Sequence, residues 1–352
     1  MKISRSTWSL LALSLLLVPA LQAQGLEITG TGATFPAKVY QQWAEHYSKD
    51  AGVLLSYKPA GSSAGVRQIQ AHAVDFGASD VPMSPQDLER HQLFQFPTLV
   101  GGVVPVVNLP GVAPGALRLD STVLARIFAG QIQFWNDKSI QALNPGLKLP
   151  PLAIQRIVRA DGSGTTEVFV RYLQQSAPEA AAPIQAQGGR AQWPGHTQGV
   201  EGSGKLAQAV RATPGSVGYI SSDYVLKEQL APVQLRNKRG DWVDPTVASF
   251  RAAIRLGGLF KNDLEATPLI DIDGIGVWPI VTATYVLVPR EPVSLERAGR
   301  TLHFFYRSFL LGDKAVAGSG FAPLPIATQA RIVSLLSGFR TQSGQPVPVL
   351  GF

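Results

Sequence analysis

The sequence predicts an α/β protein, and two observations support that prediction. Short apolar or β-branched segments alternate with segments of helical periodicity along most of the chain. Several of these segments are joined by turns rich in glycine, serine and threonine, and we find no internal repeat. Such alternation is typical of a layered structure in which helices cover a largely parallel sheet. Because the chain has no cysteine, its core must stabilise it without disulfides.

The expected elements follow in chain order. A β-branched strand at 26–29 leads to a helix from Pro36 to Tyr47, with proline in its first turn. A strand at 53–57 precedes a helix at 64–73, and the valine-rich run 96–108 is long and extended. Further along, we expect a helix at 121–129, a strand at 153–159, a helix at 166–174, strands at 216–220 and 284–288, and the longest helix at 295–311. The segment 176–202, rich in Ala, Gln, Gly and Pro, is interpreted as a surface excursion.

The first 23 residues have the pattern of a secretory signal peptide. Lys2 and Arg5 precede an apolar stretch at 8–18, and small residues end at Ala23. No cysteine follows that could carry a lipid, so we do not expect a lipoprotein. These features predict a free periplasmic protein of a double-membraned bacterium, with secretion to the medium as the alternative.

Charge and composition argue against several partners and cofactors. Loss of Lys2 and Arg5 with the signal would lower the formal net charge from +7 to +5. The remaining basic residues are scattered, so we expect no nucleic-acid partner. The five histidines have no metal-ligand spacing, and Asp271 and Asp273 lack the other ligands of a calcium loop. We therefore predict no metal and no cofactor.

Three strand-to-helix junctions share one chemistry. They are "TGTGATFPAKVY", "PAGSSAGVRQI" and "RADGSGTTEVF", the last with Arg159 at its start. In an open α/β sheet such junctions lie at the carboxyl ends of strands, where helix N-termini bind anions. One such cluster is usually only a cap, as Ser163 could be, but three in one chain favour a shared anion site.

Asp80, in "VDFGASDVPMS", places a carboxylate among these anion-binding segments. A carboxylate only accepts hydrogen bonds, so it suits an anion that keeps a proton. Phosphate near neutral pH keeps one and sulfate does not, so Asp80 would accept the phosphate proton and reject sulfate. The alternative is that Asp80 caps the turn before Pro82.

Taken together, these segments resemble a known family. "GTGATFPAKVYQQWAEHY", "GSSAGVRQI", "VDFGASDVPMS", "LFQFPTLVGGVVPVVNLPG", "VRADGSGTTEVF", "NPGLKLP", "PGSVGYI" and "WPIVTATYVLVP" are similar to the periplasmic phosphate-binding proteins of ABC-type phosphate importers. The resemblance implies a two-lobed periplasmic-binding-protein fold of type II, with two crossover hinge strands and the ligand in the cleft. It implies a lobe I of residues 24–103 and 283–352 and a lobe II of residues 104–282.

The resemblance also implies a function and its residues. The protein would be a monomer that binds inorganic phosphate and delivers it to a membrane permease without catalysis. It would serve phosphate uptake during phosphate starvation. The implied phosphate-binding residues are Thr34, Phe35, Ser62, Asp80, Arg159, Ser163, Gly164 and Thr165. Asp161 would pair with Arg159 and hold its guanidinium in place.

Two further motifs offer other interpretations. "GSSAG" matches the G-x-S-x-G pattern, so the alternative function is a secreted α/β-hydrolase, an esterase or phosphatase with Ser63 as nucleophile and His303 available as base. "GVEGSGKL" nearly matches a P-loop, but Leu206 stands where the magnesium-binding Ser or Thr should be. We interpret that segment as another helix start, and leave open whether Gly202, Ser203 and Gly204 contribute to the anion site.

Overall fold

The structure is a computed structural model, and it describes residues 26–260 and 265–352. The predicted signal peptide lies outside the described residues. The α/β class is confirmed. A nine-stranded sheet has the order β2-β1-β3-β14-β4-β10-β6-β9, and β11 pairs with β4 beside this path. The sheet is mixed rather than largely parallel, because at its centre β14 runs antiparallel to both β3 and β4, and β4 runs antiparallel to β10.

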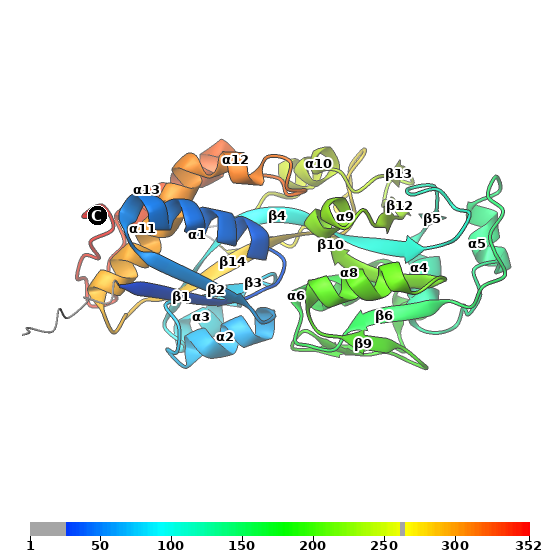
Figure 1. Cartoon of the computed structure of the whole chain (residues 1–352), viewed down its shortest axis with the longest axis horizontal. Coiled ribbons are helices and arrows are strands. Elements are labelled where there is room, and N and C mark those ends of the chain that lie inside the picture. The colour runs from blue at the N-terminus through cyan, green and yellow to red at the C-terminus, as the bar shows by residue number, and fades with distance from the viewer. Residues whose placement is uncertain (1–25, 261–264) are drawn as a thin grey trace, which may run out of the picture.

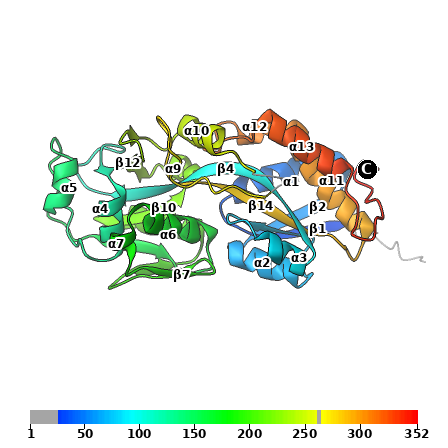
Figure 2. The same ribbon diagram turned by 180° about the vertical axis from the view of Figure 1, so that it is seen from behind.

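The molecule has two lobes, and each lobe is built on one part of the sheet (Figures 1 and 2). In lobe I, helices cover the β2-β1-β3-β14-β4 part of the sheet. Its elements are β1 (Glu27–Gly32), α1 (Ala37–Ala51), β2 (Leu54–Pro59), α2 (Ser62–Gln70), β3 (Phe76–Ser79), α3 (Pro85–Arg90), β14 (Val281–Pro289), α11 (Leu295–Leu311), α12 (Asp313–Val316) and α13 (Ile326–Ser337).

Lobe II is built on the β4-β10-β6-β9 part of the sheet. Its strands are β5 (Arg118–Leu119), β6 (Gln155–Arg159), β7 (Gln185–Gln187), β8 (Arg190–Gln192), β9 (Gln198–Val200), β10 (Ser216–Ser221), β11 (Ala231–Pro232), β12 (Gln234–Arg236) and β13 (Trp242–Val243). Its helices are α4 (Ser121–Phe128), α5 (Lys138–Leu143), α6 (Gly164–Ser176), α7 (Pro178–Ala181), α8 (Gly202–Ala212), α9 (Ser222–Lys227) and α10 (Val247–Gly257).

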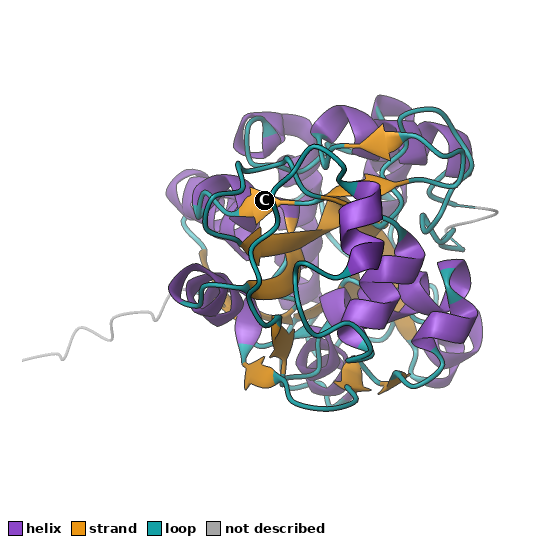
Figure 3. Ribbon diagram, turned by 90° about the vertical axis from the view of Figure 1, so that its right-hand side faces the viewer, coloured by secondary structure: helices purple, strands orange, loops and turns teal. Residues whose placement is uncertain are grey.

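Strand β4 (Leu93–Asn108) joins the two lobes. Its first part pairs with β14 from Leu93 to Gly102, and its second part pairs with β10 from Val103 to Asn108. Nearly all of its residues are buried, which fits its valine-rich sequence, because a strand covered on both faces has no polar side to present. Figure 3 shows helices surrounding the strands when the molecule is viewed from its end. The long expected strand is thus the link along which both halves of the site are placed.

The core of lobe I fixes the position of α1. The helix turns Tyr40, Trp43 and Tyr47 inward, at the spacing of one helical face. Tyr40 makes edge contacts with Phe76 and with Phe305 of α11. Gly30 lets β1 lie against this cluster, because a Cβ there would come within 2.0 Å of the Phe76 ring. The start of α1 is therefore held firmly above the end of β1.

Most of the expected elements occur within a few residues of their expected bounds, and α11 has the expected limits. The interpretation of residues 176–202 is wrong in part. Gln198–Val200 forms β9, which pairs in parallel with β6 and extends the main sheet. Gly189, also in this segment, accepts a hydrogen bond from the Ser163 amide (2.8 Å). The polar composition of residues 176–202 did not predict these contacts, because they are made by backbone groups and do not depend on the pattern of side chains.

Candidate functional site

Four helices begin where the two lobes meet. Helices α1 and α2 follow β1 and β2 in lobe I, and α6 and α8 follow β6 and β9 in lobe II (Figure 1). Their first turns lie against one another. A Cβ on Gly202 would meet Thr34, and one on Gly61 would lie 2.7 Å from the Gly162 carbonyl. Helix N-termini carry partial positive charge and free N–H groups, so this meeting point favours a compact anion.

Asp80 is the central residue of the half of the site that lobe I contributes, the lobe I half. The residue is 1% exposed, directly after β3. Its Oδ1 accepts a hydrogen bond from Thr284 Oγ1 (2.7 Å), and its amide donates to Ser62 Oγ (3.2 Å). Burial raises the pKa of Asp80 to about 7, although the Thr284 bond and the charge of Arg159 act to lower it. Near neutral pH this carboxyl therefore exists in both protonation states.

Arg159 is the centre of the lobe II half. It ends β6 and is 4% exposed. Asp161 binds it with both oxygens, through Nε (2.6 Å) and through Nη2. The remaining Nη1 donates toward Thr34 Oγ1 (3.3 Å) and Ser203 Oγ (3.2 Å). Burial acts to raise the pKa of Asp161, but the hydrogen bond and charge of Arg159 hold it below its ordinary value. Asp161 thus fixes the guanidinium, with one edge turned to the meeting point.

The two halves are in direct contact. Thr34 Oγ1 and Ser203 Oγ are 2.8 Å apart, and the Ser63 amide donates to the Gly162 carbonyl (3.2 Å). A Cβ on Gly164 would lie 2.5 Å from Ser62 Oγ and 2.8 Å from Asp80 Cβ. No other residue fits that position, so glycine is required where α6 approaches lobe I. The described conformation is therefore the closed one.

One buried hydroxyl in the site has no hydrogen-bond partner among the described residues. It is Thr165 Oγ1, in the first turn of α6, on a residue 1% exposed. Its neighbour Thr166 differs, because its Oγ1 pairs with the Tyr219 hydroxyl (2.8 Å). A buried hydroxyl left unpaired costs free energy, so Thr165 calls for a partner that a bound molecule would supply.

The structure brings all of the expected site residues to this meeting point. Phe35 is present through its backbone only, because its ring packs against Phe321 in the core (5.0 Å). Sequence reasoning missed Thr284, which is 204 positions from Asp80, and left Ser203 open. The "GVEGSGKL" motif was the available signal for Ser203, since it predicted the start of α8. No local motif marked Thr284.

The arrangement around Ser63 does not resemble a catalytic triad. Ser63 Oγ donates to the Gly188 carbonyl (2.7 Å), so a backbone oxygen takes the place that a base would need. His303 is engaged elsewhere, with its Nδ1 3.1 Å from the Tyr47 hydroxyl. Burial lowers the pKa of His303, as expected for a histidine packed in the core.

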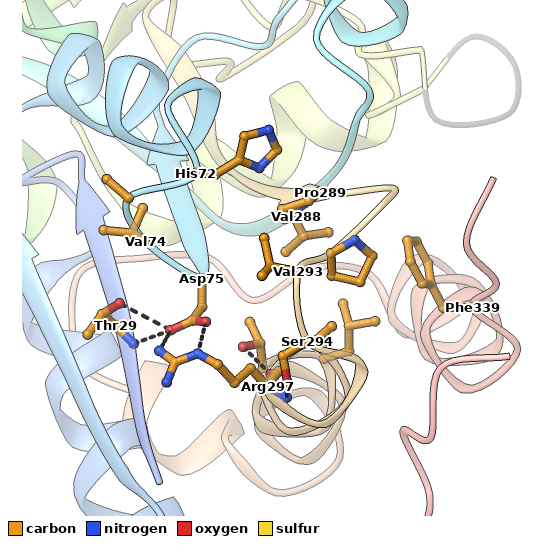
Figure 4. A pocket seen from close by; sticks show the side chains of 15 residues that line it. Thr29, His72, Val74, Asp75, Val288, Pro289, Val293, Ser294, Arg297 and Phe339 are labelled. Atoms are coloured by element: carbon orange, nitrogen blue, oxygen red, sulfur yellow. Dashed lines mark hydrogen bonds and ion pairs between the residues drawn. The ribbon is translucent and has the colours of Figure 1, made fainter. Parts of the chain in front are cut away.

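A cavity of about 240 Å³ lies at a different place, on lobe I (Figure 4). Its lining is mainly apolar, and it also includes the pair of Asp75 with Arg297, whose Nε lies 2.8 Å from Asp75 Oδ1. Asp75 also accepts hydrogen bonds from the Thr29 amide and hydroxyl. The pair is thus fully used in joining β1 to α11. The chemistry of an anion site lies between the lobes, not here.

Two kinds of feature are absent from the described residues. They contain no group of three His, Cys, Asp or Glu side chains arranged to hold a metal ion. Of the helices in these ranges, none has the length and apolar character needed to cross a membrane.

Comparison with known proteins gives concordant matches. A model of the PBP superfamily domain matches residues 18–306. The phosphate-binding protein PstS of Haemophilus influenzae is 39% identical over 312 residues, 89% of this chain and 93% of that protein. PstS of Pasteurella multocida is 39% identical over 306 residues, 87% of this chain and 88% of that protein.

Solved structures agree at the level of fold. A periplasmic phosphate-binding protein called PfluDING, bound with phosphate, has 20% identity and a TM-score of 0.70, covering 93% of this chain and 97% of that one. A phosphate-binding protein from Stenotrophomonas maltophilia has 19% identity and a TM-score of 0.67, covering 93% and 98%. The two-lobed type II fold is therefore confirmed.

Proposed function

The chain belongs to the PBP superfamily and, within it, to the PstS family of phosphate-binding proteins, and from this membership we infer that it binds inorganic phosphate and delivers it to an ABC-type permease. The observation that carries this inference is the burial of Asp80 from lobe I and of Arg159 from lobe II around one site, where Arg159 reaches Thr34 of lobe I. A fixed cation attracts an anion, and a carboxylate that only accepts hydrogen bonds selects an anion carrying a proton.

In this proposal eight residues hold the phosphate: Thr34, Phe35, Ser62, Asp80, Arg159, Ser163, Gly164 and Thr165. Arg159 donates from its free edge while Asp161 fixes the other edge. Thr165 supplies the hydroxyl that lacks a protein partner. Asp80 accepts the proton of the phosphate, and Thr284 orients the carboxyl for that task. We add Ser203, which donates or accepts beside Arg159.

The proposal includes motion. Lobe I would comprise residues 24–103 and 283–352, and lobe II residues 104–282, with β4 and the chain entering β14 as hinges. Neither half carries all the donors, so phosphate binds the closed form more tightly than an open one, and this difference drives closure. Small-angle scattering should give a smaller radius of gyration with phosphate than without it. An equal radius in both states would exclude closure.

The cellular setting is also inferred. The structural relative PfluDING is described as periplasmic, and the residues at 1–23 of this chain have a signal-peptide pattern. We infer a periplasmic monomer that is not a lipoprotein, that serves phosphate uptake during starvation, and that has the membrane permease as its partner. The protein would catalyse nothing. Purified protein should not turn over esters or phosphomonoesters, and turnover lost in Ser63→Ala would favour the hydrolase alternative.

Calorimetry tests the central claim. The purified chain, freed of phosphate by partial unfolding and dialysis, is titrated with phosphate and then with sulfate. At pH 9, where Asp80 with its pKa of about 7 is almost wholly charged, we expect saturable one-to-one binding of phosphate. Sulfate should bind at least about 100-fold more weakly there, because a buried, charged acceptor left without its donor costs about 3 kcal/mol. Equal affinity for the two anions would overturn the assignment.

A further inference from the structure

Lys38 and Asp223 form a charged contact between the lobes. Lys38 lies in the first turn of α1, one turn after Thr34 and Phe35. Asp223 is the second residue of α9 in lobe II. Lys38 Nζ is 3.9 Å from Asp223 Oδ2, and the Asp223 side chain is only 3% exposed. A carboxylate at this depth is rare in proteins unless it is paired.

Lys38 is the cation paired with Asp223. The other Asp223 oxygen, Oδ1, accepts a hydrogen bond from Ser221 Oγ (2.5 Å), a neutral group. Asp223 Oδ2 and Lys38 Nζ are both buried without a hydrogen-bond partner among the described residues. Lys38 Nζ also lies 4.5 Å from the centre of the Tyr224 ring. Nearby Glu228 pairs instead with Arg211 and Lys227. The cation that faces Asp223 therefore comes from the other lobe.

The pair belongs to the surroundings of the anion site. The negative charge of Asp223 acts on Asp80, whose pKa it helps to raise. The charge of Arg159 acts to lower the pKa of Tyr224, the next residue, and the Tyr224 ring lies beside Gly204 at the start of α8. A second buried carboxylate beside a site for an anion repels that anion unless a cation cancels it, because charges interact strongly in a buried region.

We propose that Lys38 makes the closed site acceptable to an anion by neutralising Asp223, and so acts as a positioning residue that never touches phosphate. Lys38 does this from lobe I, so the compensation depends on the two lobes lying together. The proposal rests on the phosphate-binding function inferred above. It assigns to this pair the electrostatic balance of the site, while Arg159 and the helix N-termini supply the direct contacts.

A double-mutant cycle tests this role. Phosphate affinity is measured by calorimetry for the full chain and for Lys38→Met, Asp223→Asn and the double variant. Burial raises the pKa of Asp223 to about 7 and lowers the pKa of Lys38 to about 8, so the titrations are made at pH 7.5, where both groups are mostly charged. Lys38→Met should then weaken phosphate at least about tenfold, because it leaves the Asp223 carboxylate without its cation. Asp223→Asn should bind phosphate as tightly as the unmodified chain or more tightly. The double variant should return to within about threefold of it. A merely structural loss at position 38 would not be rescued by Asp223→Asn.

Lys205→Met is the matched control. Lys205 is exposed in the first turns of α8, so this variant removes the same charge without exposing a buried carboxylate. It should change phosphate affinity less than about twofold. Lys38→Gln serves as a second variant if Lys38→Met folds poorly, which circular dichroism will show. Unchanged affinity in folded Lys38→Met, a double variant as weak as Lys38→Met, or a tenfold loss in Asp223→Asn would each overturn the proposal. Failure of the unmodified chain to bind phosphate would instead overturn the proposed function.

Discussion

The two halves of the site share a backbone design and differ in charge. Each half begins where strands end and helices start, at junctions rich in glycine, serine and threonine. The lobe I half carries Asp80 next to hydroxyls, whereas the lobe II half carries Arg159 with Asp161 fixing it. The same local geometry therefore serves two tasks. We expect lobe II to attract any compact anion, and lobe I to select an anion that carries a proton.

The largest expected effect separates these tasks directly. Asp80→Asn replaces a pure acceptor by an amide that can donate as well. At pH 9 sulfate should then bind almost as well as phosphate, so the preference of about 100-fold or more that the unmodified chain shows at this pH should collapse. Calorimetry with both anions measures this ratio. Asp50→Asn, at an exposed carboxylate on lobe I, is the control and should leave the ratio unchanged. A preserved preference in Asp80→Asn would place selectivity elsewhere.

The second prediction concerns the other half. Arg159→Ala removes a charge-assisted donor, and hydrogen bonds to charged groups contribute about 1.5–3 kcal/mol, so phosphate should bind roughly tenfold to 100-fold more weakly. Sulfate should weaken by a similar factor, which leaves the preference intact.

Because the single variant also leaves Asp161 unpaired, the same titrations are made on Arg159→Ala/Asp161→Asn. The double variant should remain at least tenfold weaker than the unmodified chain. If it binds normally, the loss came from the orphaned carboxylate and not from a missing donor.

How much of this site the sequence could predict depends on the distance along the chain. The junctions at Thr34, Ser62 and Ser163 are local, because a strand, a turn and a capped helix occupy a dozen residues. Thr284 contacts Asp80 from 204 positions away, and Lys38 contacts Asp223 from lobe to lobe. Those contacts follow from sheet order, with β14 inserted between β3 and β4, and no short pattern encodes that order. The antiparallel centre of the sheet was missed for the same reason.

The third prediction uses pH to alter only the lobe I half. The pKa of Asp80 is raised to about 7, so the carboxyl is charged above that pH and neutral below it. A neutral carboxyl can donate to sulfate, whose own charge does not change in this range. Sulfate affinity should therefore rise as pH falls, by about tenfold from pH 8 to pH 6, as the protonated fraction of Asp80 grows. Asp80→Asn should show a flat profile, and a flat profile in the unmodified chain would refute this reading of Asp80.

The smallest expected effect is at Thr165, and it tests whether the lobe II half is built for a ligand or for the fold. Its buried hydroxyl has no partner among the described residues, whereas that of Thr166 pairs with Tyr219. Thr165→Val should weaken phosphate about fivefold, the value of one hydrogen bond near 1 kcal/mol, while Thr165→Ser keeps the affinity. Without phosphate, Thr165→Val should melt at the same temperature or higher, since it removes an unsatisfied polar atom. Thr166→Val should do the reverse, losing stability because it breaks a bond within the protein. If Thr165→Val instead loses stability and keeps its affinity, then this hydroxyl supports α6, and the lobe II half binds its anion through Arg159 and the backbone alone.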